Sequence, residues 1–172
     1  PCPRHEALAR KLEKQFEVAA LYATPVSKYR YGGRIFMEET QEARDEAAML
    51  DFRVDTISVQ DKNVFIVDDS IVRGTTSRLL INLIREANPR ELHVRISSPP
   101  IMSPCPYGMD FPSKEELLAA RFEGDIDAMK DWLQVDSLAY LSPEGLMRAV
   151  HTSNQSGRSY CNACFTGVYP VP

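Results

Sequence analysis

Two adjacent carboxylates, Asp68 and Asp69, follow a run of four apolar residues, VFIV, at positions 64–67. A continuous apolar run of this length is typical of a strand covered on both faces. After the acids come Gly74 and three hydroxyl side chains at positions 75–77, where a helical pattern begins. The start of a helix offers unpaired backbone N–H groups and the positive end of the helix dipole, which together suit a phosphate group.

The two acids need a different role, because carboxylates repel a phosphate. They can accept hydrogen bonds from neighbouring hydroxyl groups, or hold a divalent cation that in turn bridges a phosphate. Carboxylates for a diol beside amides for a phosphate suit a sugar phosphate such as a ribose 5-phosphate. The alternative is that Asp68 and Asp69 only cap and turn the chain, since Asp is a favoured capping residue. A cap, however, requires only one acid.

The elements around this segment predict a parallel sheet. Residues 77–87 have the apolar spacing of a helix that ends at Asn88-Pro89, and residues 91–98 alternate as in a strand. The helical side chains that we expect to face inward are Leu79, Leu80, Leu83, Ile84 and Ala87. Strand, helix and strand in this order imply a right-handed crossover. The segment 68–76 then lies at the carboxyl end of a strand, where open α/β sheets bind ligands.

The whole chain predicts one domain at residues 1–150, followed by a linker and tail at 151–172. A basic, glycine-rich loop is expected at 28–34, and Ser113 and Glu116 predict a capping box. The other expected elements are helices at 6–16, 40–50, 115–120, 124–133 and 142–150, and strands at 18–24 and 137–141.

Composition limits the function classes. The 172 residues are 44% hydrophobic and 26% charged with a net charge of -4, which argues against general nucleic-acid binding. No apolar run approaches the length of a membrane span, and the N-terminus does not resemble a signal peptide. Four cysteines without a secretory signal predict a reduced, cytoplasmic setting. Because the chain begins at Pro1 rather than Met, we expect a piece of a longer protein.

Several motifs together resemble one family. VDDSIVRGTTS, at 67–77, resembles the phosphoribosyl-pyrophosphate (PRPP) motif of type I phosphoribosyltransferases, and in particular that of the glutamine PRPP amidotransferases. KYRYGGRIF, at 28–36, resembles the flexible loop of that family. ISSPPIMSPCPYGMD, LAYLSPEGL and CNACFTGVYP resemble its later segments, in the same order. The resemblance therefore covers nearly all of the chain from about residue 24 onward.

The resemblance implies an α/β fold: the parallel sheet of a type I phosphoribosyltransferase with helices on both faces, truncated at its N-terminus, and a C-terminal helical tail with cysteines. The implied reaction is the displacement of pyrophosphate from PRPP by ammonia, which gives 5-phosphoribosylamine at the first step of purine synthesis. Purine nucleotides are further implied ligands. Since no segment resembles the family's glutaminase domain, such a domain or subunit is an expected partner. We also expect a homo-oligomer.

The resemblance also assigns residues. Asp68 and Asp69 are expected to bind the ribose hydroxyls, and to hold the Mg²⁺ ion that accompanies the pyrophosphate. The residues expected to complete the PRPP site around its 5-phosphate are Ser70, Arg73, Gly74, Thr75, Thr76 and Ser77. The flexible loop is expected to close over PRPP and exclude water. Its residues expected to meet the pyrophosphate are Lys28, Arg30, Tyr31 and Arg34, of which Lys28, Tyr31 and Arg34 have catalytic roles. A solvated basic loop is the alternative for this segment.

Three cysteines match positions that hold a [4Fe–4S] cluster in one branch of this family: Cys105, Cys161 and Cys164. The family's fourth ligand lies upstream of Pro1, and Cys2 replaces it only if the fold brings it close. A Cys-x-x-Cys pair by itself is also consistent with a redox pair, half of a zinc site or a chance spacing. Free cysteines that remain from an ancestral cluster are a further alternative.

One segment departs from the family pattern. PCPRHE, at 1–6, stands in place of the family's pyrophosphate loop, with Arg4 and His5 where small residues normally occur. This favours an alternative hypothesis, a regulatory module that binds PRPP or a nucleotide without transfer. A third hypothesis is a phosphoribosyltransferase that uses a purine or pyrimidine base as acceptor, but the family-specific tail argues against it.

Overall fold

The structure, a computed structural model, describes most of the chain from residue 52 onward. The described residues are 26–28, 52–109, 113–153 and 160–170. The elements predicted at 6–16, 18–24 and 40–50 and most of the predicted loop at 28–34 lie outside them. The predicted sheet, its connecting helices and most of the tail lie within them.

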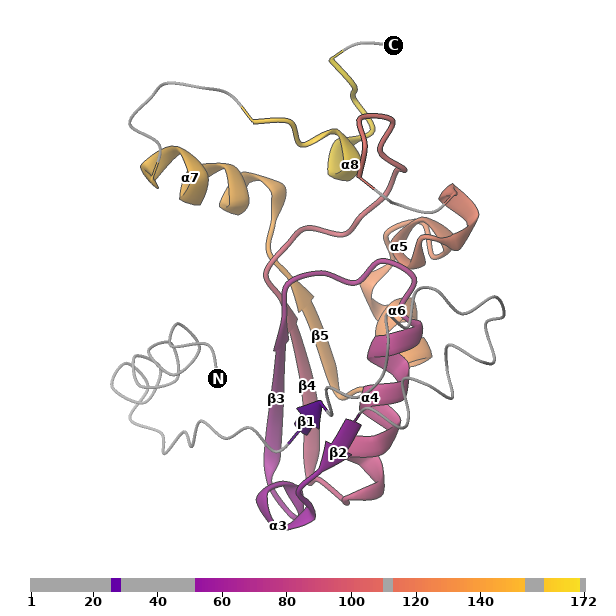
Figure 1. Ribbon diagram of the computed structural model, residues 1–172, viewed down its shortest axis with the longest axis vertical. Helices are drawn as coiled ribbons and strands as arrows, with labels where there is room; N and C mark the ends of the chain where they lie inside the picture. Colours follow the sequence, from indigo (N-terminus) through magenta and orange to yellow (C-terminus); the bar gives the residue numbers. More distant parts are fainter. Residues whose placement is uncertain (1–25, 29–51, 110–112, 154–159, 171–172) are drawn as a thin grey trace.

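Three parallel strands form the main sheet (Figure 1). They are β3 (Asn63–Asp68), β4 (Glu91–Ile96) and β5 (Ser137–Tyr140), in the order β3-β4-β5. Asp68 pairs with Ile96, and Ile96 pairs with Tyr140, so the three strands end at one edge. A separate antiparallel pair consists of β1 (Val26–Lys28) and β2 (Phe52–Val54). The predicted parallel sheet and its three strands are confirmed.

Helices connect the strands, as parallel pairing requires. The helix α4 (Thr75–Glu86) leads from β3 to β4, and η2 (Lys114–Glu116), α5 (Leu118–Arg121) and α6 (Ile126–Leu133) lie between β4 and β5. The remaining described helices are α3 (Thr56–Val59), α7 (Pro143–Ser153) and α8 (Ala163–Thr166). None of the helices that the structure describes is both long and apolar enough to cross a membrane.

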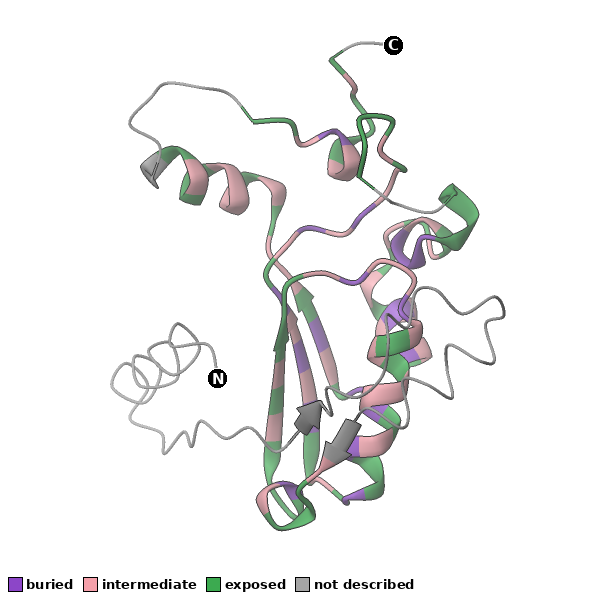
Figure 2. Cartoon of the chain, viewed as in Figure 1, coloured by how far each residue is buried: buried purple, intermediate pink, exposed green. Residues whose placement is uncertain are grey.

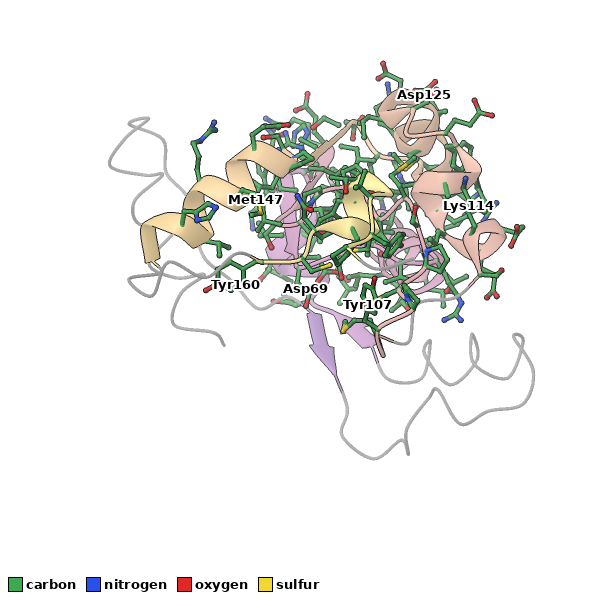
Figure 3. All side chains as sticks on the ribbon, turned by 90° about the horizontal axis from the view of Figure 1, so that it is seen from above. Asp69, Tyr107, Lys114, Asp125, Met147 and Tyr160 are labelled. Atoms are coloured by element: carbon green, nitrogen blue, oxygen red, sulfur yellow. The ribbon has the colours of Figure 1, made fainter. Side chains whose placement is uncertain are left out.

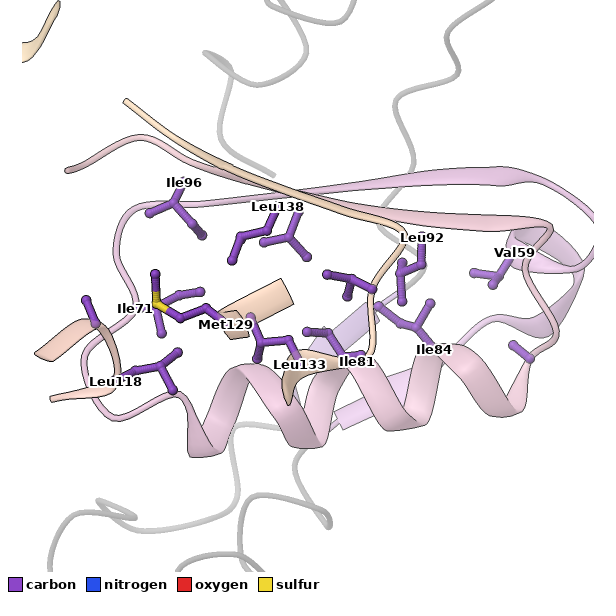
Figure 4. Close-up of a cluster of buried hydrophobic side chains, with 14 residues drawn as sticks. Val59, Ile71, Ile81, Ile84, Leu92, Ile96, Leu118, Met129, Leu133 and Leu138 are labelled. Carbon is purple, nitrogen blue, oxygen red and sulfur yellow. The ribbon is translucent and has the colours of Figure 1, made fainter. Parts of the chain in front are cut away.

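One face of the sheet carries the hydrophobic core (Figure 4). Leu92, Val94 and Ile96 alternate with half-buried residues along β4, and each of the three is at most 4% exposed. The residues of α4 and α6 that join them in this cluster are Ile81, Ile84, Met129 and Leu133. Burial of such a side chain stabilises the fold by about 1.5–3 kcal/mol, so this contact fixes both helices on the sheet.

The prediction for the inward face of α4 was partly wrong. Ile84 and Ala87 are buried as expected, but Ile81, which was not among the expected residues, is only 1% exposed. The three expected leucines, Leu79, Leu80 and Leu83, are half-buried. Ile81, Ile84 and Ala87 are three residues apart and so follow one stripe of the helix toward the sheet, while the leucines lie at its sides.

The opposite face of the sheet is more open than the apolar run at 64–67 predicted (Figure 2). Phe65 is 60% exposed and Val67 is 42% exposed, because both point away from the core on the α4 side. The ring of Phe65 stacks on that of His93, with 4.5 Å between centroids, and the guanidinium of Arg95 lies 5.6 Å from the Phe65 centroid. Within the described residues, the core helices α4 and α6 cover one face, whereas helices were predicted on both.

Of the two helix N-caps predicted from the sequence, at Ser142 and Ser113, only the one at Ser142 is formed. At α7 the amide of Gly145 donates to Oγ of Ser142 over 3.0 Å, with Pro143 first in the helix, as predicted. The capping box of Ser113 and Glu116 is wrong, since Ser113 makes no side-chain cap bond and begins a short 3₁₀ turn. Glu116 accepts from the hydroxyl of Ser113 over 3.5 Å and also pairs with Arg73, a residue of the connection between β3 and α4.

The last residue of β5, Tyr140, has a buried side-chain hydroxyl whose effect on stability can be measured. Its hydroxyl is buried without a hydrogen-bond partner among the described residues, and burial raises the pKa of Tyr140 to about 12. Because an unsatisfied buried hydroxyl is unfavourable, Tyr140→Phe should raise the free energy of unfolding by about 1 kcal/mol. Urea denaturation at neutral pH measures this value.

The same substitution should change the alkaline stability. The unfolded tyrosine loses its proton near pH 10, before the folded one, so Tyr140 lowers stability as pH rises from about 10 to 12. Tyr140→Phe should remove that part of the decline, and Tyr160→Phe, at an exposed tyrosine, should not. A loss of stability in Tyr140→Phe at neutral pH would contradict this view of the hydroxyl.

Candidate functional site

The carboxyl edge of the sheet presents the two predicted acids (Figure 3). The amide and the hydroxyl of Ser97 both donate to the carbonyl of Asp68, over 3.0 Å and 3.1 Å, and so tie the end of β3 to the chain after β4. Asp68 and Asp69 are both exposed, and Asp69 lies at the edge that is seen from above in Figure 3. The strand ends therefore hold the first acid by its backbone, and both acidic residues are exposed at this edge.

The paired acids do not cap the following helix. Oδ1 of Asp68 accepts from the amide of Asp69 over 2.9 Å, and Oδ1 of Asp69 accepts from the hydroxyl of Ser70 over 3.0 Å. The N-cap residue of α4 is Gly74, and no side chain there makes a cap bond. The alternative in which these acids cap α4 is therefore wrong, although local bonds of this kind do help to turn the chain.

Gly74 turns the chain into α4 in a left-handed conformation, with φ 82° and ψ -6°. A residue with a side chain is strained there, so the position favours glycine. The first turn of α4 consists of the three predicted hydroxyl residues, Thr75, Thr76 and Ser77. With no side-chain cap at Gly74, the amides of this turn are in the arrangement that binds an anion at a helix start.

Arg73 forms an ion pair that was not predicted from the sequence. Its Nε donates to Oε2 of Glu116 over 2.8 Å, and this bond is the main reason that the pKa of Glu116 lies below its usual value. Both side chains are exposed enough for solvent to weaken the pair. Arg73 directly precedes Gly74 in this turn, and its role toward a phosphate stays a prediction.

Val72, Arg73 and Gly74 are consecutive residues of the turn. Each of them contacts a residue whose role here was not predicted from the sequence. The amide of Leu118 donates to the carbonyl of Val72 over 2.8 Å, next to the Arg73–Glu116 pair. A Cβ added to Gly74 would lie 2.9 Å from Cδ2 of Leu118 and 3.0 Å from Cζ3 of Trp132. No spacing pattern in a sequence indicates contacts between residues so far apart in the chain. The one available signal for Trp132 was that it is the only tryptophan of the sequence.

Comparison with known proteins gives this geometry a family context. No family model matches the chain. Over 150 residues it is 44% identical to the amidophosphoribosyltransferase of Archaeoglobus fulgidus, a match that covers 87% of this chain and 32% of that protein. The chain is homologous to one region of the amidophosphoribosyltransferases. It spans about a third of the length of the curated relatives that it matches.

Solved structures agree with this relation and with the predicted fold. The glutamine PRPP amidotransferase of B. subtilis, complexed with ADP and GMP, matches with a TM-score of 0.73 and 37% identity over 94% of this chain and 35% of that one. The allosteric regulatory enzyme of purine biosynthesis matches with a TM-score of 0.71 and 40% identity over 87% of this chain and 32% of that one. The expected phosphoribosyltransferase fold of the amidotransferase family is confirmed.

The residues of the amidotransferase-like flexible loop are not placed. Lys28 is the last residue of β1, where only the backbone is described. Arg30, Tyr31 and Arg34 lie outside the described residues. Their roles toward pyrophosphate stay predictions.

Cys105 and the two cysteines of the amidotransferase-like tail, Cys161 and Cys164, lie near one another. The amides of Met102 and Ser103 donate to the carbonyl of Cys164 over 2.8 Å and 3.0 Å, and this holds α8 against the segment that contains Cys105. Burial, with smaller contributions from nearby Cys105 and Cys161, raises the pKa of the Cys164 thiol. All three cysteines are free thiols, and Cys161 is exposed.

These thiols fit a cluster by ligand type. Iron–sulfur clusters are held by cysteine thiolates. The fold brings three cysteines from two segments near one another. Within the part of the chain that the structure describes, however, no three His, Cys, Asp or Glu side chains form a group that would hold a single metal ion. The thiols are therefore neighbours rather than a closed set of ligands.

Replacement of Gly74 tests the geometry of the turn. Gly74→Ala should lower the free energy of unfolding by more than the roughly 1–2 kcal/mol of a left-handed alanine, because the Cβ would also meet Leu118 and Trp132. Gly124→Ala is a matched control, since its φ is 80° but the nearest atom, of Met102, is at an ordinary 3.6 Å. Chemical denaturation of both variants gives the comparison, and equal losses would contradict the crowding at Gly74.

Proposed function

We propose that this chain binds PRPP at the junction of β3 and α4 and transfers its phosphoribosyl group to ammonia, releasing pyrophosphate. One observation carries the proposal: two exposed carboxylates and an uncapped helix start lie at opposite ends of one short connection, at the carboxyl edge of a parallel sheet. This pairs acceptors for a diol with donors for a phosphate. The relation to amidophosphoribosyltransferases supports the choice of PRPP as the sugar phosphate.

In the proposed complex Asp68 and Asp69 accept hydrogen bonds from the 2′- and 3′-hydroxyls of the ribose. Hydrogen bonds to charged acceptors contribute more than neutral ones, about 1.5–3 kcal/mol each. The amides and hydroxyls of residues 75–77 donate to the 5-phosphate, with Ser70 and Arg73 at the side of the turn. Both ends of the sugar phosphate are thereby fixed, which leaves C1 to face the nucleophile.

Mg²⁺ fits the donors that the site offers. This ion is usually bound by one or two carboxylates together with phosphate oxygens and water, and Asp68 and Asp69 are two adjacent exposed carboxylates. When bound, the ion would neutralise part of the charge on the pyrophosphate. The orientation of the ribose is the contribution of the two aspartates themselves.

The predicted flexible loop supplies the proposed transition-state contacts. Departure of pyrophosphate builds negative charge on the leaving group, so cations that close over it favour the transition state. Lys28, Arg30 and Arg34 provide such cations, and Tyr31 helps to exclude water. This assignment is supported by the resemblance of residues 28–36 to the family loop.

The proposed partners follow from the same relation. A glutaminase domain or subunit supplies the ammonia, and two copies or more of the chain associate. Purine nucleotides are proposed ligands because the B. subtilis relative was solved with ADP and GMP. A reducing compartment, the cytoplasm, is proposed from the three free thiols in the described residues.

A [4Fe–4S] cluster is a proposed cofactor of the tail. Cys105, Cys161 and Cys164 would hold three of its irons, and the fourth ligand would come from outside the described residues. The tail would then be tied more firmly to the segment around Met102 and Ser103, whose amides already bond to Cys164. The cluster takes no part in the transfer step proposed here.

Binding of PRPP tests the proposed function. The double variant Asp68→Asn and Asp69→Asn should bind PRPP with Mg²⁺ at least about tenfold more weakly, since it loses two charged acceptors. Calorimetry on the whole chain measures the change. Asp61→Asn, at an exposed acid before the start of β3, is the matched control. An unchanged affinity in the double variant would refute the assignment of the acids.

A second candidate is a regulatory module that binds nucleotide or PRPP without transfer, and the nucleotides in the B. subtilis complex favour it. Pyrophosphate release with PRPP and ammonium ions supports the enzyme. Binding of PRPP or a purine nucleotide without release supports the module. Release that requires a purine or pyrimidine base would instead show a base-specific phosphoribosyltransferase.

Iron content tests the proposed cluster. Protein purified without oxygen should contain about four irons per chain, as a [4Fe–4S] cluster requires, and Cys164→Ser should lose most of them. Cys2→Ser, at the remaining cysteine, shows whether that residue is the fourth ligand. Wild-type protein without iron, whose three thiols all react with a thiol reagent, would contradict the cluster.

A further inference from the structure

A tryptophan of α6 packs directly against the glycine that begins α4. An ideal Cβ on Gly74 would lie 3.0 Å from Cζ3 and 3.3 Å from Cη2 of Trp132. On the same side it would lie 2.9 Å from Cδ2 of Leu118, which is fully buried. Gly74 itself is buried, so the edge of the indole ring and the leucine methyl form a solid support behind the turn.

The turn needs support of this kind because of its glycine. Glycine populates positive and negative φ about equally, so Gly74 does not hold φ 82° by its own preference. Close-packed side chains leave a backbone few alternative positions. The contact with Trp132 and Leu118 therefore restricts the conformations that Gly74 can adopt, and with them the direction of the first amides of α4.

The indole is itself fixed from α4 and α5. The guanidinium carbon of Arg78, in the first turns of α4, lies 4.7 Å from the centroid of the Trp132 ring, and that of Arg121 lies 5.5 Å away. Cation–π contacts of this length are favourable. The amide of Arg78 donates to the carbonyl of Gly74 over 2.9 Å, so the same residue contacts both the ring and the turn.

We propose that Trp132 is a positioning residue for the anion site: by holding Gly74 it aims the amides of residues 75–77 at the phosphate of the sugar. The inference rests on the proposed function, in that it takes a phosphate as the ligand of this turn. Trp132 acts through Gly74 and does not contact the ligand. Loss of the ring should therefore weaken phosphate binding while the two aspartates stay unchanged.

The chain offers a direct optical test, because Trp132 is its only tryptophan. Titration of the wild-type chain with ribose 5-phosphate should change the tryptophan emission with the midpoint that calorimetry gives. Ribose without the phosphate should leave the emission unchanged at the same concentration. Saturable binding of ribose 5-phosphate by calorimetry with no change in emission would overturn the proposed coupling between the Trp132 ring and the bound phosphate.

Variants then separate positioning from stability. Trp132→Leu should raise the dissociation constant for ribose 5-phosphate at least about tenfold, the scale expected when a binding group is misplaced, and Trp132→Phe should have a smaller effect. Leu133→Val is the matched control, since Leu133 is fully buried on the same helix but is not among the nearest neighbours of Gly74. It should lower the melting temperature and leave the dissociation constant within about twofold.

Hydrogen exchange tests the positioning role of Trp132 separately from the proposed function. In the ligand-free chain, amides of residues 72–77 should exchange faster in Trp132→Leu than in the wild type, and not in Leu133→Val. If the wild type fails to bind ribose 5-phosphate, the proposed function fails, while the exchange comparison still decides the positioning role. Unchanged exchange and unchanged affinity in Trp132→Leu would overturn the inference.

Discussion

At Gly74 the backbone takes a left-handed turn with φ 82°, and the direction of the first amides of α4 depends on it. The turn lets the chain leave β3 at Asp68 and enter α4 at Thr75 within one short connection. Carboxylates and helix amides therefore meet at the same edge of the sheet. A longer connection between β3 and α4 would separate the carboxylates from the helix amides. The combination that suits a sugar phosphate would then be lost.

The turn is stabilised from a distant part of the chain. Val72, Arg73 and Gly74 are held in succession by a backbone bond from Leu118, an ion pair with Glu116 and packing against Trp132. All three partners belong to the connection between β4 and β5, which also supplies Met129 and Leu133 to the core. The hydrophobic core and the site are thus continuous, and the rigidity of the turn comes from the packing of that connection.

The sequence alone predicted the parts of this account that depend on local order. The run at 64–67, the helix after it and the strand predicted at 91–98, which the structure ends at Ile96, followed from apolar spacing. The two acids and the glycine followed from residue type. The sequence did not predict the packing partners. The choice of Ile81 for the core depends on how α4 rotates against the sheet, and Glu116 pairs with Arg73 because η2 brings it there. Such contacts form only when the connections between strands are folded.

In the proposed complex, the one connection between β3 and α4 binds both ends of a sugar phosphate. A crystal structure of the chain with ribose 5-phosphate tests it most directly. We expect the phosphate at the amides of residues 75–77 and the ribose hydroxyls at Asp68 and Asp69. Density for the sugar phosphate at any other place, or a phosphate at α4 with the hydroxyls turned away from both acids, would contradict it.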